Sequence, residues 1–309
     1  MNGHHHHHHH HLHLMPEDGG DRRMVWAVAA NVALTAGQIA GGIVAGSIAL
    51  VADAVHNLSD AMTLGIALAA RRIARRPSDA GMTFGYGRAE TVAALVNYTT
   101  LVLVSLYLAY EAVWRMIDPT PVTGWIVIAV AGFALAVDVA TAALTWKLAK
   151  DSLNIRAAFL HNMADAGTSV AVILGGVLVM LYDWRLVDPL LTLGISGYIL
   201  WHAVRGIVPV IRILMLGAPP GVDARAVADA MRDQPGVVGV HNLYLWQIDE
   251  RRFTLQAHVV LEAHVPEAEA RAALRSMLGA QFHLGQITLE VERRDDGCVS
   301  APLIGAGPG

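Results

Sequence analysis

Two short motifs place a histidine and an aspartate inside apolar stretches of the chain. His56 and Asp60 lie four residues apart in the first, and His161 and Asp165 repeat this spacing in the second half of the sequence. In a helix, residues four apart lie on the same face, one turn above the other. Two such helices packed face to face would offer two imidazoles and two carboxylates to one point. This set of ligands suits a tetrahedral divalent ion, and zinc fits it best.

A simpler interpretation exists for each motif taken alone, because a single histidine in a membrane helix can serve only to hydrogen-bond a neighbouring helix. The repetition of the spacing, with an aspartate each time, favours a metal site. A charged group near the centre of a bilayer costs at least about 2.5 kcal/mol, so such residues are candidates for function.

The composition indicates a membrane protein, and the sequence shows no motif typical of an enzyme. Hydrophobic residues make up 54% of the 309 residues and charged residues only 16%, which is too apolar for an ordinary soluble protein. The net charge is −4 and no dense basic patch is present, so we expect no nucleic-acid partner. The single cysteine, Cys298, excludes an intramolecular disulfide and a thiolate cluster. No nucleophile–base arrangement or phosphate-binding glycine loop suggests a hydrolase or an ATPase.

Six apolar stretches have about the 20 residues that a membrane-spanning helix needs. They cover residues 24–45, 48–70, 90–113, 124–146, 156–181 and 186–213. Twelve Lys and Arg residues flank them on one side and only Arg115 and Arg185 on the other. Because basic residues accumulate on the cytoplasmic side, we predict six transmembrane helices with both termini in the cytoplasm.

The two ends of the chain differ from the rest. Residues 1–22 carry an unbroken histidine run, His4 to His11, which is either a purification tag preceding Met15 or a native metal-collecting arm. We expect these residues and the tail 296–309 to be disordered, and residues 23–215 to form the transmembrane domain.

A second domain is predicted over residues 216–295, after the helix-breaking cluster Gly217–Gly221. Its periodicity predicts a helix capped by Asp223, two strands joined by a hairpin, a second helix and a last strand. These elements cover residues 224–233, 237–248, 252–262, 266–280 and 286–293. The αββαβ order predicts a small cytoplasmic sandwich, ferredoxin-like or metallochaperone-like, with both helices on one face of the sheet.

The strand periodicity also suggests a second metal site in this domain. His258 lies on the polar face of its strand, Glu290 and Glu292 lie on the polar face of the last strand, and His241 begins the first strand. Together these four side chains would form a cytoplasmic metal site. An ordinary solvated sheet face explains the same pattern, so both interpretations stay open.

Two further polar residues lie near the first motif. Asp53 precedes His56 by three residues, so it either hydrogen-bonds this ligand histidine or is a structural residue at the mouth of the span. Gln38 lies among glycines of the first span, and we interpret it as a sign of close helix packing.

Longer segments around these motifs resemble a known family, the cation diffusion facilitators, and specifically its zinc-exporting branch. The similar segments are Ser47–Asp60, Thr83–Glu90, Ser152–Asp165 and Pro235–Leu243. The resemblance implies a homodimer in a bacterial cytoplasmic membrane that alternates between inward-open and outward-open states. It implies exchange of a cytoplasmic divalent cation for protons, with Zn(II) as the transported substrate and a possible regulatory ligand, and no organic cofactor.

The resemblance also assigns residues. It implies that His56, Asp60, His161 and Asp165 bind the transported ion, and His56 matches the pattern of relatives that favour zinc. His241, His258, Glu290 and Glu292 fall at ligand positions of the cytoplasmic domain.

The metal site that some relatives have between the second and third spans looks incomplete. Asp79 matches one ligand position, but Met82 and Tyr86 stand where histidines would be needed. We therefore expect no metal in this loop.

Neutral imidazole and carboxylate groups bind either a metal ion or protons. Competition between the metal ion and protons for these groups would couple metal export to proton entry. The rival interpretation is a membrane metal sensor that binds zinc without transporting it.

Overall fold

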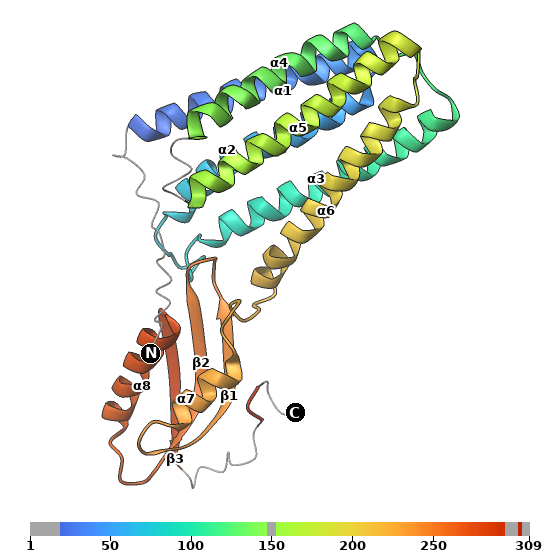
Figure 1. The fold of residues 1–309 in the computed structure, drawn as a ribbon. Helices are drawn as coiled ribbons and strands as arrows, with labels where there is room; N and C mark the ends of the chain where they lie inside the picture. Colours follow the sequence, from blue (N-terminus) through green and yellow to red (C-terminus); the bar gives the residue numbers. More distant parts are fainter. Residues whose placement is uncertain (1–18, 147–152, 294–301, 305–309) are drawn as a thin grey trace, which may run out of the picture. The chain divides into compact units, whose positions relative to one another are not determined.

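The computed structural model describes residues 19–146, 153–293 and 302–304 (Figure 1). The histidine run and Cys298 lie outside these residues. The chain forms two compact units, one comprising the chain up to Gly65 with Leu101–Leu200, the other comprising Ile66–Thr100 and the chain from Trp201 onward.

Six long helices coincide with the six predicted spans to within a few residues. They are α1 (Gly19–Ala45), α2 (Ile48–Ala74), α3 (Arg88–Ile117), α4 (Gly124–Trp146), α5 (Leu153–Tyr182) and α6 (Val187–Leu214). In the described part of the chain, α3, α4, α5 and α6 contain apolar runs long enough to cross a membrane. The apolar stretches found in α1 and α2 are shorter, Asn31–Ala45 and Ile48–Ser59. The protein is therefore a multi-pass membrane protein.

Small residues line the interior of the first unit and let its helices approach closely. The helices α4 and α5 approach closely at Gly124 and Gly176, where a Cβ added to Gly124 would lie 2.5 Å from the Gly176 carbonyl oxygen. Alanines such as Ala52, Ala54 and Ala131 are fully buried. Close backbone packing of this kind is typical of membrane helices, which gain little from burying one apolar surface against another.

A buried carboxylate fixes the start of α2. Asp188, in the first turn of α6, accepts hydrogen bonds from the Ser47 hydroxyl at 2.5 Å and from the backbone N–H groups of Ile48 and Ala49 at 3.0 and 3.4 Å. The first N–H groups of a helix have no partner within the helix, so an acceptor from elsewhere must satisfy them. The preceding Gly46 turns the chain with φ +73°, a conformation that glycine adopts without strain. We call these contacts the Asp188 cap.

The second unit contains a small sheet domain with the predicted αββαβ order. It consists of α7 (Ala224–Arg232), β1 (Val237–Gln247), β2 (Phe253–Leu261), α8 (Glu267–Phe282) and β3 (Gln286–Arg293). The strand order is β1-β2-β3, with β1 and β2 antiparallel and β2 and β3 parallel. A parallel pair needs a crossover connection, and α8 supplies it.

One face of the sheet carries the core, as the alternation in β2 predicts. Leu255, Ala257, Val259 and Leu261 are all fully buried, and α7 and α8 supply core residues such as Met231 and Leu278 to the same cluster. Asp223 caps α7 as expected, because its side chain accepts a hydrogen bond from the Arg225 N–H. In β2 the opposite face carries His258 together with Thr254, Gln256 and Val260.

Candidate metal sites

The first histidine–aspartate motif meets the second across the helix bundle. His56 of α2 and Asp165 of α5 lie 109 positions apart in the sequence, yet His56 Nε2 is 3.2 Å from Asp165 Oδ1. Their exposed fractions are only 7% and 6%. The structure therefore brings together two of the four predicted ligands. We call the position between these two helices the bundle site.

The other two predicted ligands share the same helices. Asp60 follows His56 by four residues in α2, and His161 precedes Asp165 by four residues in α5. Their side chains lie outside the described residues, so the complete set of four ligands stays a prediction. An imidazole nitrogen and a carboxylate oxygen this close can bind one divalent cation or share a proton.

Contacts from α1 and α6 surround the bundle site. The ring of Tyr198, in α6, meets the ring of His56 edge-on with 5.7 Å between centroids. The amide of Gln38, in α1, donates through Nε2 to Asp53 Oδ2 at 3.2 Å. Asp53 thus has a partner in α1, and Gln38 does more than allow close packing. The signal in the sequence was an amide side chain in a mostly apolar run, but the partner of this amide could not be inferred from spacing.

The sheet domain gathers three of its four candidate ligands into a compact cluster. One ligand atom from each of His241, His258 and Glu292 lies within 4.8 Å of the other two. Glu292 is central, because Oε1 is 2.5 Å from His258 Nδ1 and Oε2 is 3.2 Å from His241 Nε2. Glu290 approaches from the rim, with Oε2 3.3 Å from His258 Nε2 and a side chain that is 65% exposed. We call these four residues the sheet site.

Strand pairing explains why these residues meet. His241 in β1 lies opposite His258 in β2, and His258 lies opposite Glu290 in β3. The β1–β2 register shifts just after His241, where Asn242 adopts φ +47°. Such a bulge bends a strand and redirects the side chains beside it. The alternation of residue types in the sequence does not predict this bulge.

Burial distinguishes the sheet site from a solvated sheet face. His241 and Glu292 are 5% and 9% exposed. Although His241 Nε2 and Glu292 Oε2 are 3.2 Å apart, neither of these buried atoms has a correctly aligned hydrogen bond within the described residues. Buried polar atoms nearly always have partners. A divalent cation between the histidines and the glutamate would supply one, so the residues fit a metal ion.

Changing His241 to alanine should therefore remove the stabilisation that zinc gives to the sheet domain. Ligand binding to the folded state alone stabilises it by about 2.7 kcal/mol when the ligand is at 100 times its dissociation constant. The measurement is the thermal unfolding midpoint of the detergent-solubilised protein with and without zinc, in variants that also carry Asp165→Asn to weaken the bundle site. Glu290→Gln is the matched control and should keep most of the shift. An equal shift with and without His241 would exclude it as a ligand.

The loop between α2 and α3 uses its candidate ligand for local structure. Asp79 Oδ2 accepts a hydrogen bond from the Tyr86 hydroxyl at 2.7 Å, and Oδ1 accepts from the N–H groups of Gly81 and Met82. The Tyr86 hydrogen bond, with help from the two backbone N–H groups, lowers the pKa of Asp79 below its usual value. The expectation that the loop holds no metal stays a prediction, and Asp79 has a structural role in any case.

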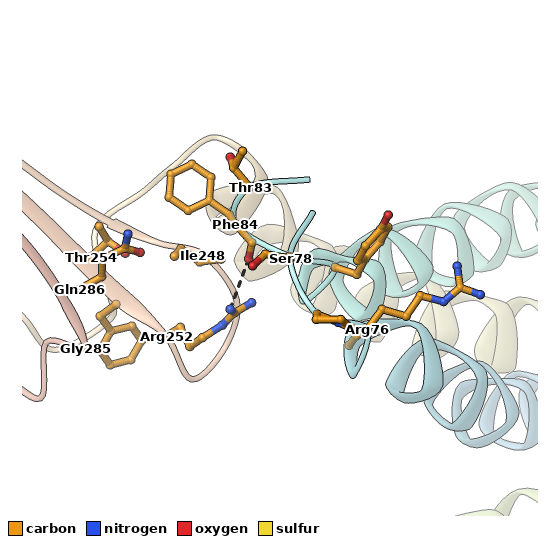
Figure 2. Close-up of a pocket in the computed structure, with 14 residues that line it drawn as sticks. Arg76, Ser78, Thr83, Phe84, Ile248, Arg252, Thr254, Gly285 and Gln286 are labelled. Carbon is orange, nitrogen blue, oxygen red and sulfur yellow. Dashed lines mark hydrogen bonds between the residues drawn. The ribbon is translucent and has the colours of Figure 1, made fainter. Parts of the chain in front are cut away.

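A cavity of about 540 Å³ lies beside this loop within the second unit (Figure 2). It is lined by residues of the loop, such as Ser78 and Phe84, and by residues of the sheet domain, such as Thr254 and Gln286. One Arg252 N–H group donates to the Phe84 carbonyl oxygen at 3.3 Å, the contact drawn in Figure 2. The residues that line this cavity include no His, Asp, Glu or Cys, so it offers no metal ligands.

The fold and the two sites define a class, membrane proteins that handle divalent metal ions. Comparison with known families agrees, because a model of the cation efflux transmembrane domain matches residues 24–215 and a model of the cation efflux protein cytoplasmic domain matches residues 219–294. The chain belongs to the cation efflux family. This confirms the resemblance inferred from the motifs.

Curated relatives align with most of the chain. A cation efflux system protein CzcD from an Alcaligenes strain is 33% identical over 89% of this chain and 87% of its own. The zinc transporter ZitB of Pectobacterium atrosepticum is 35% identical over 92% and 90%. A cadmium, cobalt and zinc/H(+)-K(+) antiporter of Bacillus subtilis is 32% identical over 82% of each chain.

Among the solved structures that match is the metal-bound C-terminal domain of the CzcD transporter of Cupriavidus metallidurans. It is 32% identical over 23% of this chain and 99% of that one, with a TM-score of 0.22. The relatives are thus cation and zinc efflux transporters.

Proposed function

We propose that this protein exports divalent cations, zinc foremost, from the cytoplasm in exchange for protons. The observation that carries the proposal is the buried contact between His56 and Asp165. Each of these residues belongs to a His-x-x-x-Asp motif, so Asp60 and His161 would complete a four-ligand transport site. Zinc accepts nitrogen and oxygen ligands in a tetrahedral arrangement, which these four side chains would supply.

The names of the relatives support both parts of the proposal. ZitB is a zinc transporter, and the Bacillus protein is an antiporter of cadmium, cobalt and zinc against H(+) and K(+). Divalent ions of this kind differ little in their preference for imidazole and carboxylate ligands, so cadmium and cobalt would also pass.

The same ligands would couple the metal to protons. Histidine has an ordinary pKa of about 6.5, close to cellular pH. Facing the cytoplasm, the ligands would be mostly deprotonated and bind the ion. Facing a more acidic compartment, they would bind protons and release it. Alternating access keeps the site closed to one side at a time, so an inward proton gradient drives export.

The proposed transporter crosses a bacterial cytoplasmic membrane six times, with both termini in the cytoplasm, and works as a homodimer. The excess of Lys and Arg on one side of the helices supports this orientation. The helices α1 and α2 belong to the same set of spans, because the apolar runs 24–45 and 48–70 of the sequence have about the length that a crossing needs. The sheet site would sense cytoplasmic zinc, and it changes transport only if zinc favours one state of the protein.

Zinc flux into proteoliposomes with a pH gradient tests the proposal. We expect uptake when the lumen is more acidic than the outside, and loss of uptake when an ionophore dissipates the gradient. Liposomes with equal pH on both sides serve as the control. Saturable zinc binding without any flux would overturn the proposal and would identify the protein as a membrane metal sensor.

A further inference from the structure

A buried hydrogen-bond chain links α1 to the polar residues of α2. Gln38 and Asp53 are each 1% exposed. Gln38 uses both ends of its amide toward α2: Nε2 donates to Asp53 Oδ2 at 3.2 Å, and Oε1 accepts from Asn57 Nδ2 at 3.4 Å. A buried amide without partners would be unfavourable, and these two contacts satisfy it.

The two partners of Gln38 lie on either side of His56 in the sequence of α2. Asp53 is three residues before His56, close to one helical turn, and Asn57 follows it directly. Two contacts of the His56 ring come from other helices, from Asp165 in α5 and from Tyr198 in α6. Gln38 therefore reaches the bundle site through the residues of α2 that flank the ligand histidine.

Asp53 needs such a partner because it is otherwise poorly satisfied. Its Oδ1 is buried and has no hydrogen-bond partner within the described residues. Gln38 thus supplies an uncharged donor that holds one carboxylate oxygen and leaves the other open. Without this donor, the carboxyl group would be free to turn, and its oxygen atoms would move relative to the bundle site.

We propose that Gln38 is a positioning residue for the transport site, and that it sets the affinity of this site for the metal by holding Asp53 and Asn57 beside His56. The inference rests on the proposed function, because it assumes that His56 binds the transported ion. Residues that orient metal ligands typically change affinity by about 10- to 100-fold when they are lost. The effect should appear in metal affinity more than in the maximal rate.

The test compares Gln38→Met with Thr35→Val. Methionine keeps the length and flexibility of glutamine but has no amide. Thr35 is equally buried, at 1% exposure, and lies one turn away in α1. In proteoliposomes, we expect Gln38→Met to raise KM for zinc about tenfold with a maximal rate within about twofold of the unchanged protein. Thr35→Val should change neither.

A double-mutant cycle distinguishes a positioning role of Gln38 from a general disturbance of the helix bundle. If Gln38 acts through Asp53, the substitution Gln38→Met should change KM little when Asp53→Ala, which removes the acceptor of the Gln38 amide, is already present. The absorption spectrum of bound Co(II) gives a second readout, because it reports ligand geometry in detergent without any transport. We expect an altered spectrum in Gln38→Met and an unchanged one in Thr35→Val.

The results that would overturn the role of Gln38 differ from the results that would overturn the proposed transport function. An unchanged KM and Co(II) spectrum in Gln38→Met, in a protein whose unsubstituted form transports zinc, would overturn the inference alone. Additive effects of Gln38→Met and Asp53→Ala would also overturn it. Absence of flux in the unsubstituted protein would overturn the proposed function, while the Co(II) spectra would still decide whether Gln38 positions the site.

Discussion

Asp165→Asn is expected to abolish zinc transport, with a loss of at least about 100-fold in flux at low zinc. Asparagine keeps the size of the side chain and can still hydrogen-bond His56, whose Nε2 lies 3.2 Å from Asp165 Oδ1. It lacks the negative charge that a divalent cation needs inside an apolar bundle, and even the loss of an outer partner of a metal ligand costs about 10- to 100-fold. The measurement is initial zinc uptake by proteoliposomes with an acidic lumen.

Ser169→Ala is the matched control for this substitution. Ser169 lies one turn beyond Asp165 in α5 and is fully buried. Loss of the Ser169 hydroxyl should leave zinc uptake within about twofold of that of the unchanged protein, because small substitutions away from the site usually have small effects. Uptake that survived Asp165→Asn would mean that His56 and Asp165 form a structural pair, and the transport site would have to be sought elsewhere.

Asp188→Asn should produce the largest loss of stability. The Asp188 cap satisfies the Ser47 hydroxyl and two backbone N–H groups at the start of α2. An amide offers one oxygen and turns an N–H₂ group toward the other donors, so at least one buried donor loses its acceptor. Each hydrogen bond to a charged acceptor contributes about 1.5–3 kcal/mol, so we expect a loss of about 3 kcal/mol.

Thermal unfolding in detergent, followed by loss of helical circular dichroism, measures this effect. Asp183→Asn is the control, because Asp183 lies nearby in the sequence but its ion pair with Arg185 is exposed. Exposed ion pairs contribute little to stability, and asparagine tolerates the φ of +49° at this position. Similar unfolding midpoints for the two variants would show that the cap does not anchor α2.

Local pattern was sufficient to predict most of the elements. The apolar runs located six helices, and the alternation in β2 identified the buried face through Leu255, Ala257 and Val259. The Asp223 cap was predicted from residue type alone. These features depend on residues close together in the chain, which is why periodicity and capping rules identify them.

The contacts that shape the sites depend on residues far apart. The partner of Asp53 is in a different helix, and the acceptor at the start of α2 lies 141 positions from Ser47. The bulge after His241 is a property of how two strands pair, and it decides which way the histidine faces. No spacing rule within one segment contains this information. The pairing of His56 with Asp165 was predicted only because the motif occurs twice.

The C-terminal residues 302–304 lie along the outer edge of β1. The Asn242 N–H donates to the Pro302 carbonyl oxygen at 3.2 Å, the Leu243 N–H donates to the Leu303 carbonyl oxygen at 2.8 Å, and Leu243 forms an isolated parallel bridge with Ile304. An uncovered edge strand offers unpaired backbone groups to other chains and promotes aggregation. This short segment therefore shields one side of the sheet from strand exchange with other molecules. A chain truncated before Pro302 would lose that shield and become prone to self-association through β1.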